Sequence, residues 1–148
     1  LKLHGALANM ASENENLARA CYEAALSVDP DIIIMVLAGT AQEAAARSLG
    51  ARMACEIFAD RAYNADCTLV DRRQPGAVIH DADRAAARIL EMLRAGAIIA
   101  EDGTHIPTRI DTICLHGDTP EAVGIAKSLR AGLEAAGVRV ARFEGARG

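Results

Sequence analysis

The 148 residues are about the length of one domain, and 51% of them are hydrophobic, which is enough for a real core. The formal net charge of −4, with two Tyr, two Phe and no Trp, argues against a nucleic-acid-binding surface, which needs a basic stripe and stacking rings. No apolar run reaches the roughly 18 residues of a membrane span, and residues 1–20 show no secretory signal. The four cysteines form no CxxC pair, so we expect reduced structural thiols in a cytoplasmic protein.

The first half of the chain predicts three strands and two helices. They are the end of a strand at 1–3, a helix at 12–29, a doubly buried strand at 32–37, an Ala-rich helix at 41–48 and a strand at 52–58. Ser12 and Glu15 are expected to form a capping box at the first helix. The buried face of that helix is expected to carry Leu17, Cys21, Ala24 and Val28.

The second half begins with a polar loop over 59–77, long enough to be a lid or a binding loop. A helix over 82–95 follows, capped by Asp81, and a hairpin over 97–107 turns at Asp102-Gly103. The remaining predicted elements are a strand at 111–115, a helix that begins at Thr119-Pro120 and ends at Gly137, and a strand at 138–140.

Alternation of strands and helices predicts an α/β fold with parallel strands and helical crossovers. Two sheets fit this order: an open doubly wound sheet, or an arc of a (β/α) barrel. A complete barrel needs about 200–250 residues, so this chain would supply only part of one.

Histidines mark the ends of two predicted strands, and each is followed by glycine. His4 and His116 would then lie where ligands bind in either architecture, at the carboxyl ends of parallel strands. Lys2 shares its side of the strand with His4, and Asp118 follows His116 closely. We therefore expect both imidazoles to face one cleft.

The loop after the third strand adds further candidates at the same edge. Asp60 and Arg61 follow the strand directly, and Arg72 lies further along; arginine binds carboxylate or phosphate with two parallel hydrogen bonds. Each candidate also has a purely structural interpretation. Asp118 would favour a helix dipole, Asp60 and Arg61 would pin the loop, and Arg72 would be a solvated charge. His80 and His105 are expected on the surface.

A metal or a phosphate loop is the weaker expectation. His4, His116 and Asp118 would make a set of N and O ligands, but no HExxH spacing supports it, and no metal site is predicted. Gly39-Thr40 precedes a helix, yet no GxxxxGK[ST] or GxGxxG motif is present, so an ordinary cap is favoured.

Three segments together resemble a known family. "LKLHGALAN" is similar to the (V/L)KPHGALYN segment of the LamB/YcsF family. "EIFADRAYNADCTLVDRRQPGAVIHD" is similar to its EVFADRxYxxDGxLVPRxxPGAVI segment, and "TICLHGDTPEAVGIAKSLRAGLEAAGVRV" to its ICxHGDxPxAVxxAxxxRxxLxxxGV segment. The resemblance runs in order over nearly the whole chain.

The resemblance implies an irregular (β/α) barrel of the glycoside hydrolase/deacetylase type. It also implies ATP-dependent opening of 5-oxo-L-proline to L-glutamate, carried out with two other subunits. ATP, with its Mg²⁺, would be a co-substrate, and no tightly bound cofactor is expected. Family segments that read DLNADLGE, ACGFHAGD and GAHPS have no counterpart here. We therefore expect a single domain over 1–148 that is the C-terminal part of the barrel, with N-terminal strands missing.

We assign roles by combining strand-end positions with this resemblance. The predicted acid/base groups are His116, oriented by Asp118 or Asp60, with His4 opposite. The predicted substrate- and phosphate-binding groups are Lys2, Arg61, Arg72 and Asn9. A homo-oligomer is possible. The alternatives are a non-catalytic substrate-binding or scaffolding subunit, and a metal-dependent carbohydrate deacetylase-like hydrolase.

The chain departs from the family pattern at Leu3, Ala8, Cys67 and Asp71. Ala8 replaces a Tyr, which removes one possible pocket wall. Cys67 replaces a Gly, and we expect a strained turn if that position requires a positive φ.

Overall fold

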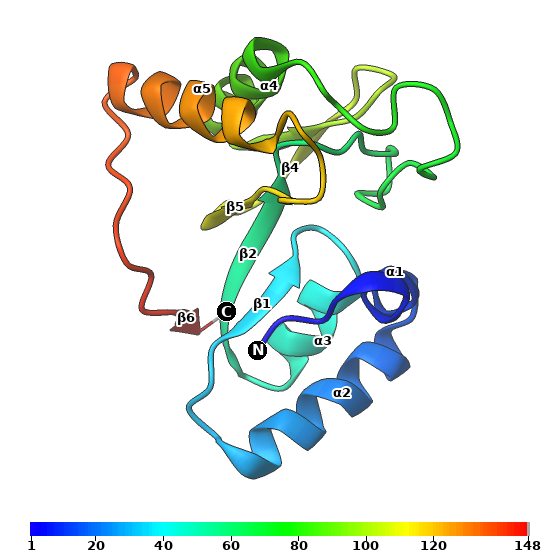
Figure 1. Ribbon diagram of the computed structural model, residues 1–148. Helices are drawn as coiled ribbons and strands as arrows, with labels where there is room; N and C mark the ends of the chain where they lie inside the picture. Colours follow the sequence, from blue (N-terminus) through cyan, green and yellow to red (C-terminus); the bar gives the residue numbers. More distant parts are fainter. Residues whose placement is uncertain (148) are drawn as a thin grey trace.

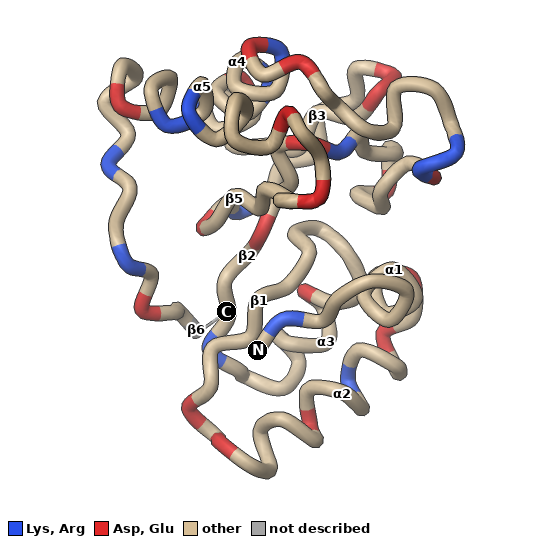
Figure 2. Tube along the Cα trace, in the orientation of Figure 1, with Lys and Arg blue, Asp and Glu red and all other residues tan. Residues whose placement is uncertain are grey.

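The computed structural model describes residues 1–147 and places a parallel sheet between two groups of helices (Figure 1). The first group is α1 (Gly5–Glu13), α2 (Glu15–Val28) and α3 (Ala41–Ser48), and the second is α4 (Ala82–Ala95) and α5 (Ala122–Ala135). Helices of the same group pack on one another, α4 against α5 most extensively. Figure 2 shows basic and acidic positions mixed over the helices and loops.

The sheet has β2 (Arg52–Phe58) at its centre, with β1 (Ile34–Leu37) and β5 (Thr112–Cys114) parallel to it on either side. Lys2 adds a parallel bridge to Met35 of β1. A separate hairpin joins β3 (Ala97–Ile99) to β4 (His105–Pro107). The predicted α/β class with parallel strands is confirmed, and β2 has the bounds that the sequence predicts.

Several polar side chains of the candidate functional site lie on one face of this sheet. Glu56 lies opposite Leu37 of β1 and Thr112 of β5, and Phe58 lies opposite Cys114. Because side chains alternate along a strand, Glu56 and Phe58 project to the same side, which we call the inner face. The core includes the side chains of the other face, such as Cys55 and Ile57, both fully buried.

The helical region before β1 differs from its prediction. Two helices replace one: Asn14 ends α1 and caps α2, where its side chain accepts from the Leu17 N–H at 3.0 Å. The expected capping box of Ser12 and Glu15 is wrong, because the Ser12 hydroxyl donates to the Asn9 carbonyl inside α1. Without an intervening Pro or Gly, the apolar periodicity alone does not reveal this break.

The buried face of α2 is also rotated from the predicted one. Ala18 and Tyr22 are buried, whereas Ala24 is exposed and Val28 is 87% exposed. The Tyr22 hydroxyl donates to the Gln42 side chain at 3.1 Å, and this amide also donates to the Ala8 carbonyl. Gln42 therefore ties α1, α2 and α3 together, a polar contact that a hydrophobic pattern does not predict.

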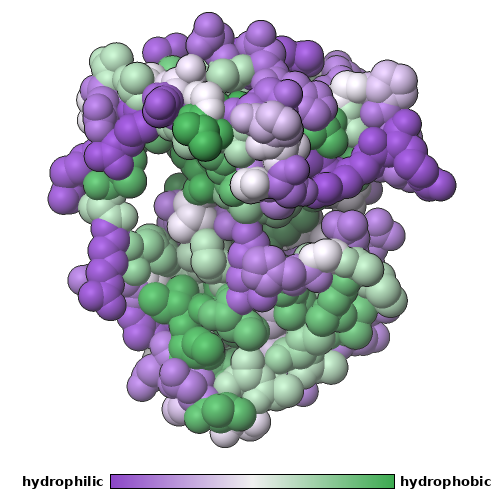
Figure 3. Space-filling view, in the orientation of Figure 1, coloured by the Kyte–Doolittle hydropathy of each residue, from purple (hydrophilic) through white to green (hydrophobic). Residues whose placement is uncertain are grey.

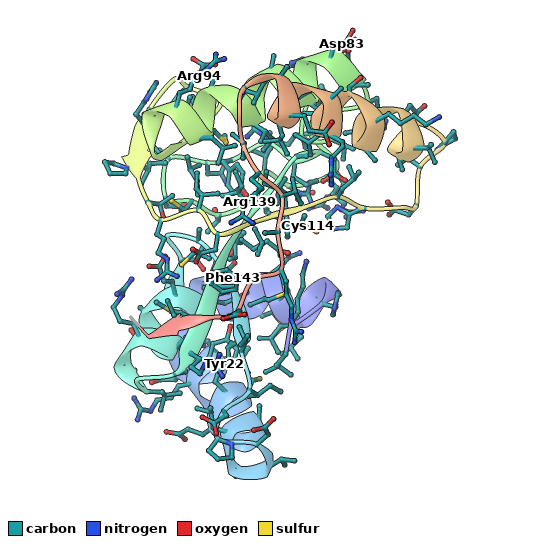
Figure 4. All side chains as sticks on the ribbon, turned by 90° about the vertical axis from the view of Figure 1, so that its left-hand side faces the viewer. Tyr22, Asp83, Arg94, Cys114, Arg139 and Phe143 are labelled. Carbon is teal, nitrogen blue, oxygen red and sulfur yellow. The ribbon has the colours of Figure 1, made fainter. Side chains whose placement is uncertain are left out.

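The C-terminal part contains two further corrections. Helix α5 begins at Ala122 rather than at Thr119-Pro120, and the Thr119 carbonyl accepts from the Ala122 N–H in the turn before it. Residues 138–140 form no strand. Instead, the segment after α5 crosses in front of β5, as the labelled Arg139, Phe143 and Cys114 show (Figure 4), and ends in β6 (Ala146–Arg147), antiparallel to β2.

Helix α4 and its hairpin match their predictions. The Asp81 carboxylate accepts from the Arg84 N–H at 2.7 Å, and Gly96 ends the helix in the left-handed region at φ +59°. Ala85, Ala86, Ile89 and Met92 are the buried residues of α4. Among residues 1–147, no helix is both long and apolar enough to cross a membrane.

Candidate functional site

His116 and Asp60 form a direct pair beyond the carboxyl ends of β5 and β2. The ring Nδ1 of His116 lies 2.8 Å from one Asp60 carboxylate oxygen and 3.0 Å from the other, and the His116 backbone N–H also donates to Asp60 at 3.3 Å. The Asp60 side chain is buried, whereas 29% of the His116 side chain is exposed. Asp60, one of the two predicted partners, therefore holds His116.

This arrangement fixes the chemistry open to the imidazole. A carboxylate only accepts hydrogen bonds. Nδ1 therefore carries a proton and donates a hydrogen bond to Asp60. The other ring nitrogen, Nε2, is then unprotonated and can accept a hydrogen bond from a ligand. A carboxylate that orients a histidine in this way is the arrangement used for general acid/base catalysis.

Phe58 connects this pair to the predicted cation Lys2. The Phe58 ring meets the His116 ring edge to face, with centroids 5.2 Å apart. The Lys2 ammonium lies 5.2 Å from the centroid of the same ring, within the range of a cation–π contact. The predicted acid/base group, His116, and the predicted cation, Lys2, thus both contact the Phe58 ring.

Glu56 and Cys114 bind the Lys2 ammonium on the inner face. The Lys2 Nζ lies 2.8 and 2.6 Å from the two Glu56 carboxylate oxygens and donates to the Cys114 sulfur at 3.1 Å. Burial lowers the pKa of Lys2, but the hydrogen bonds to Glu56 and Cys114 outweigh it and the pKa is raised. Burial raises the pKa of the Cys114 thiol, and the hydrogen bond from Lys2 offsets this in part. The resting cluster therefore contains an ammonium, a carboxylate and a neutral thiol.

Arg61 turns away from this cluster. It is 4% exposed, and its guanidinium donates to the Val70 carbonyl at 2.7 Å and to the Ala77 carbonyl at 3.3 Å. Burial lowers the pKa of Arg61. Its geometry fits the structural interpretation, in which it pins the loop between β2 and α4, better than a role in binding phosphate.

Arg72 and Asp118 lie together on the surface instead of beside the His116 imidazole. Their charged groups are 3.7 Å apart, with side chains 55% and 60% exposed. His80 makes a similar exposed contact with Glu121 at 3.6 Å. These two contacts connect the loop after β2 to the segment before α5, but exposed pairs of this kind contribute little stability.

His4 is the N-cap residue of α1, and Asn9 lies in the middle of that helix. His4 is exposed at the helix N-cap, without a side-chain cap, and Asn9 lines a cavity of about 20 Å³ with Lys2, Glu56 and Phe58. That volume suits about one water molecule. No measured contact joins His4 to His116, so their convergence on one cleft stays a prediction.

A much larger cavity lies elsewhere. Its volume is about 630 Å³, and it opens beneath the C-terminal segment beside β5 and α5, where the hollow has hydrophobic residues at its rim (Figure 3). Its walls are mainly apolar, with Ile113, Leu115 and Leu133 among them, and none of the predicted site residues lines it. The polar chemistry therefore belongs to the inner face.

The geometry supports neither a metal site nor a phosphate loop among the described residues. Within 1–147, no three His, Cys, Asp or Glu side chains are grouped to hold a metal, so His4, His116 and Asp118 do not form the set weighed from the sequence. The Gly39 N–H before α3 donates to the Glu43 side chain at 2.8 Å, and the Thr40 side chain accepts from the Gln42 N–H. This turn is an ordinary helix cap, already occupied by a carboxylate.

Glu56 is the site residue that sequence reasoning missed. The signal was present, because a single acidic residue interrupts the apolar strand "RMACEIF". A charge in a buried strand needs a partner, and its spacing of two and four residues from Phe58 and Asp60 places it on their side.

Comparison with known proteins adds a family and several relatives. The profile of the LamB/YcsF family matches residues 1–148. The chain is 67% identical over 144 residues to a Ruegeria pomeroyi protein named as the A subunit of 5-oxoprolinase, and 48% identical over 147 residues to the protein of the same name from Nitrobacter hamburgensis. It covers 57% and 58% of those two proteins, which themselves match 97% and 99% of it.

A solved structure is also similar. The lactam utilization protein from Thermus thermophilus superposes with a TM-score of 0.82 at 40% identity, and the match covers 96% of this chain and 56% of that one. The chain thus spans little more than half the length of these relatives.

Proposed function

Because the chain belongs to the LamB/YcsF family, we propose that it forms part of the subunit of an ATP-dependent 5-oxoprolinase that acts on 5-oxo-L-proline. In this proposal the subunit works in a cytoplasmic complex with two others, as the word "subunit" in the relatives' names supports. The observation that carries a catalytic role is the His116–Asp60 pair at the carboxyl edge of the sheet.

The proposed reaction needs activation, because the amide carbon of a lactam is a poor electrophile. Transfer of a phosphoryl group from ATP to the amide oxygen makes that carbon reactive, and water then attacks it. Ring opening breaks the C–N bond and leaves the γ-phosphate ester of glutamate as a mixed anhydride. A second water hydrolyses this acyl phosphate, so that two waters are used and the products are L-glutamate, ADP and phosphate. The Nε2 of His116 takes a proton from the attacking water and returns one to the departing nitrogen.

Cations are needed for the substrate carboxylate and the transferred phosphoryl group. Lys2 is the proposed cation on the inner face, Arg72 the proposed cation on the loop, and Asn9 a proposed hydrogen-bonding group beside Lys2. The turn at Gly39-Thr40 offers no free phosphate cradle, so ATP with its Mg²⁺ is not placed there.

The experiment is a reconstitution with the intact protein and its partner subunits. The proposal predicts ATP hydrolysis and L-glutamate formation that depend on 5-oxo-L-proline, and loss of both in His116→Ala. The exposed His80 supplies a matched control, and His80→Ala should retain activity. Full activity of a folded His116→Ala complex would contradict the catalytic role and favour the non-catalytic binding subunit.

A further inference from the structure

Glu56 is a buried carboxylate whose position needs an explanation. It is 4% exposed and lies near the end of the central strand, between Cys55 and Ile57, both fully buried. Burying a charge is costly unless it is paired and hydrogen-bonded, and replacing a whole buried ion pair by apolar residues of similar volume is often neutral or stabilising. Its presence therefore indicates a task other than holding the strand in place.

The partner of Glu56 lies in the segment that precedes α1. Lys2 lies in a segment attached to the sheet through one bridge, to Met35, and through backbone hydrogen bonds of Leu1. Among the residues that the structure describes, the other contacts of the ammonium are with the Cys114 sulfur, which is a weak acceptor, and with the face of Phe58. A long lysine side chain without a firm acceptor extends its charge toward water.

We propose that Glu56 is a positioning residue that holds the Lys2 ammonium on the inner face, against Phe58 and beside the His116–Asp60 pair. The role of Lys2 in catalysis rests on the proposed function, whereas the contact between Glu56 and Lys2 does not depend on it. Glu56 itself does not touch the reacting atoms. Its carboxylate fixes where the lysine charge lies, and the Phe58 ring contacts both that charge and the imidazole.

Thr112 gives a second sign that this face is built for a polar ligand. Its hydroxyl is buried without a hydrogen-bond partner among the described residues, and Thr112 lies directly opposite Glu56 in the sheet. A buried hydroxyl without a partner is uncommon in a folded protein and calls for a water or a bound group. The Glu56–Lys2 pair and Thr112 therefore line the same face.

The test uses the reactivity of single lysines in the intact protein. The chain contains two lysines, Lys2 and the exposed Lys127, which serves as an internal control. Acetylation with an amine-selective acetyl ester is followed by mass spectrometry of the peptides that carry each lysine. In the wild type, Lys2 should react roughly tenfold or more slowly than Lys127, because its ammonium is hydrogen-bonded to Glu56 and partly buried, whereas Lys127 is exposed.

Glu56→Gln should speed Lys2 acetylation roughly tenfold, because the ammonium loses its charge-assisted hydrogen bond, and should leave Lys127 unchanged. Glu56→Asp should retain part of the protection, and Glu134→Gln, on the exposed surface of α5, should alter neither rate. Equal rates for Lys2 and Lys127 in the wild type would overturn the proposal even if Glu56→Gln failed to fold, as would an unchanged Lys2 rate in folded Glu56→Gln.

Activity is a separate readout. Glu56→Gln should raise the KM for 5-oxo-L-proline more than it lowers kcat, because the lysine stays present but less well placed. If the labelling behaves as expected while no complex shows oxoproline-dependent turnover, the positioning of Lys2 by Glu56 stands and only the proposed function fails.

Discussion

Gly39 and Cys67 lie against each other where the turn after β1 meets the loop after β2. A Cβ added to Gly39 would lie 2.5 Å from the Cys67 sulfur, and Gly39 itself adopts φ +74°. Cys67 has φ +66° and is the one non-glycine residue with a positive φ among the described residues. The strained turn expected from a cysteine in place of the family's glycine is thus confirmed.

This strain leads to a stability prediction for two variants that both remove the sulfur. Cys67→Gly should be more stable than Cys67→Ala by about 1 kcal/mol, because only glycine adopts the left-handed region without a steric cost. Urea unfolding of the two variants measures the difference directly. Equal stability, or a more stable alanine variant, would show that the turn relaxes to a negative φ.

The buried hydrogen bonds of Arg61 lead to a prediction about the stability of the loop between β2 and α4. Arg61→Met removes the hydrogen bonds to the Val70 and Ala77 carbonyls and should cost about 2 kcal/mol. Amide hydrogen exchange over residues 68–79 should speed up more than exchange in α4. Arg73→Met is the control, since Arg73 is exposed and pairs only with Asp71 nearby. Unchanged amide hydrogen exchange of the loop in Arg61→Met would show that Arg61 does not hold the loop in place.

The strands and α4 could be predicted because their signals are local. A β-branched run, a capping Asp81 and a terminal Gly96 act on neighbouring residues, and these elements form as expected. The break at Asn14 and the late start of α5 could not be predicted, because competing caps are only a few residues apart. Residues 138–140 have strand propensity but find no partner strand, so tertiary pairing overrides the pattern.

The site was predictable to the extent that parallel strands deliver their ends to one edge. That rule brought Asp60 and His116 together from 56 residues apart. It could not show that Arg61 turns inward, because side-chain direction in an irregular loop has no simple period. It also left Glu56 unassigned, since its partner Lys2 is distant in the sequence.

Buried thiols predict how stability depends on alkaline pH. Burial raises the pKa of Cys67 to about 11 and that of Cys55 to about 12, from an ordinary value of 9.0. Above pH 9 the unfolded chain therefore loses protons that the folded chain keeps, and the free energy of unfolding falls. The slope should approach about 1.4 kcal/mol per pH unit for each thiol up to about pH 11, with no such loss below pH 9.

Urea unfolding at pH 8, 9, 10 and 10.5 measures this loss, and the Cys67→Ala variant should have a shallower slope, since one of the buried thiols with a raised pKa is gone. The raised pKa of Lys2 acts in the same direction above pH 10.5, where its ion pair with Glu56 is lost. A constant unfolding free energy from pH 8 to 10.5 would contradict the burial of these thiols.

The proposed catalysis depends on His116 and Asp60 acting as one acid/base unit. The most direct measurement is the rate of oxoproline-dependent ATP hydrolysis by intact complexes that carry His116→Ala, Asp60→Asn, or both. Each single variant should lose roughly 10²- to 10⁴-fold in kcat/KM, and the double variant should lose no more than His116→Ala alone. Two results would contradict the joint action of His116 and Asp60. One is a double variant whose loss in kcat/KM is the product of the two single losses, and the other is a wild-type rate in folded His116→Ala.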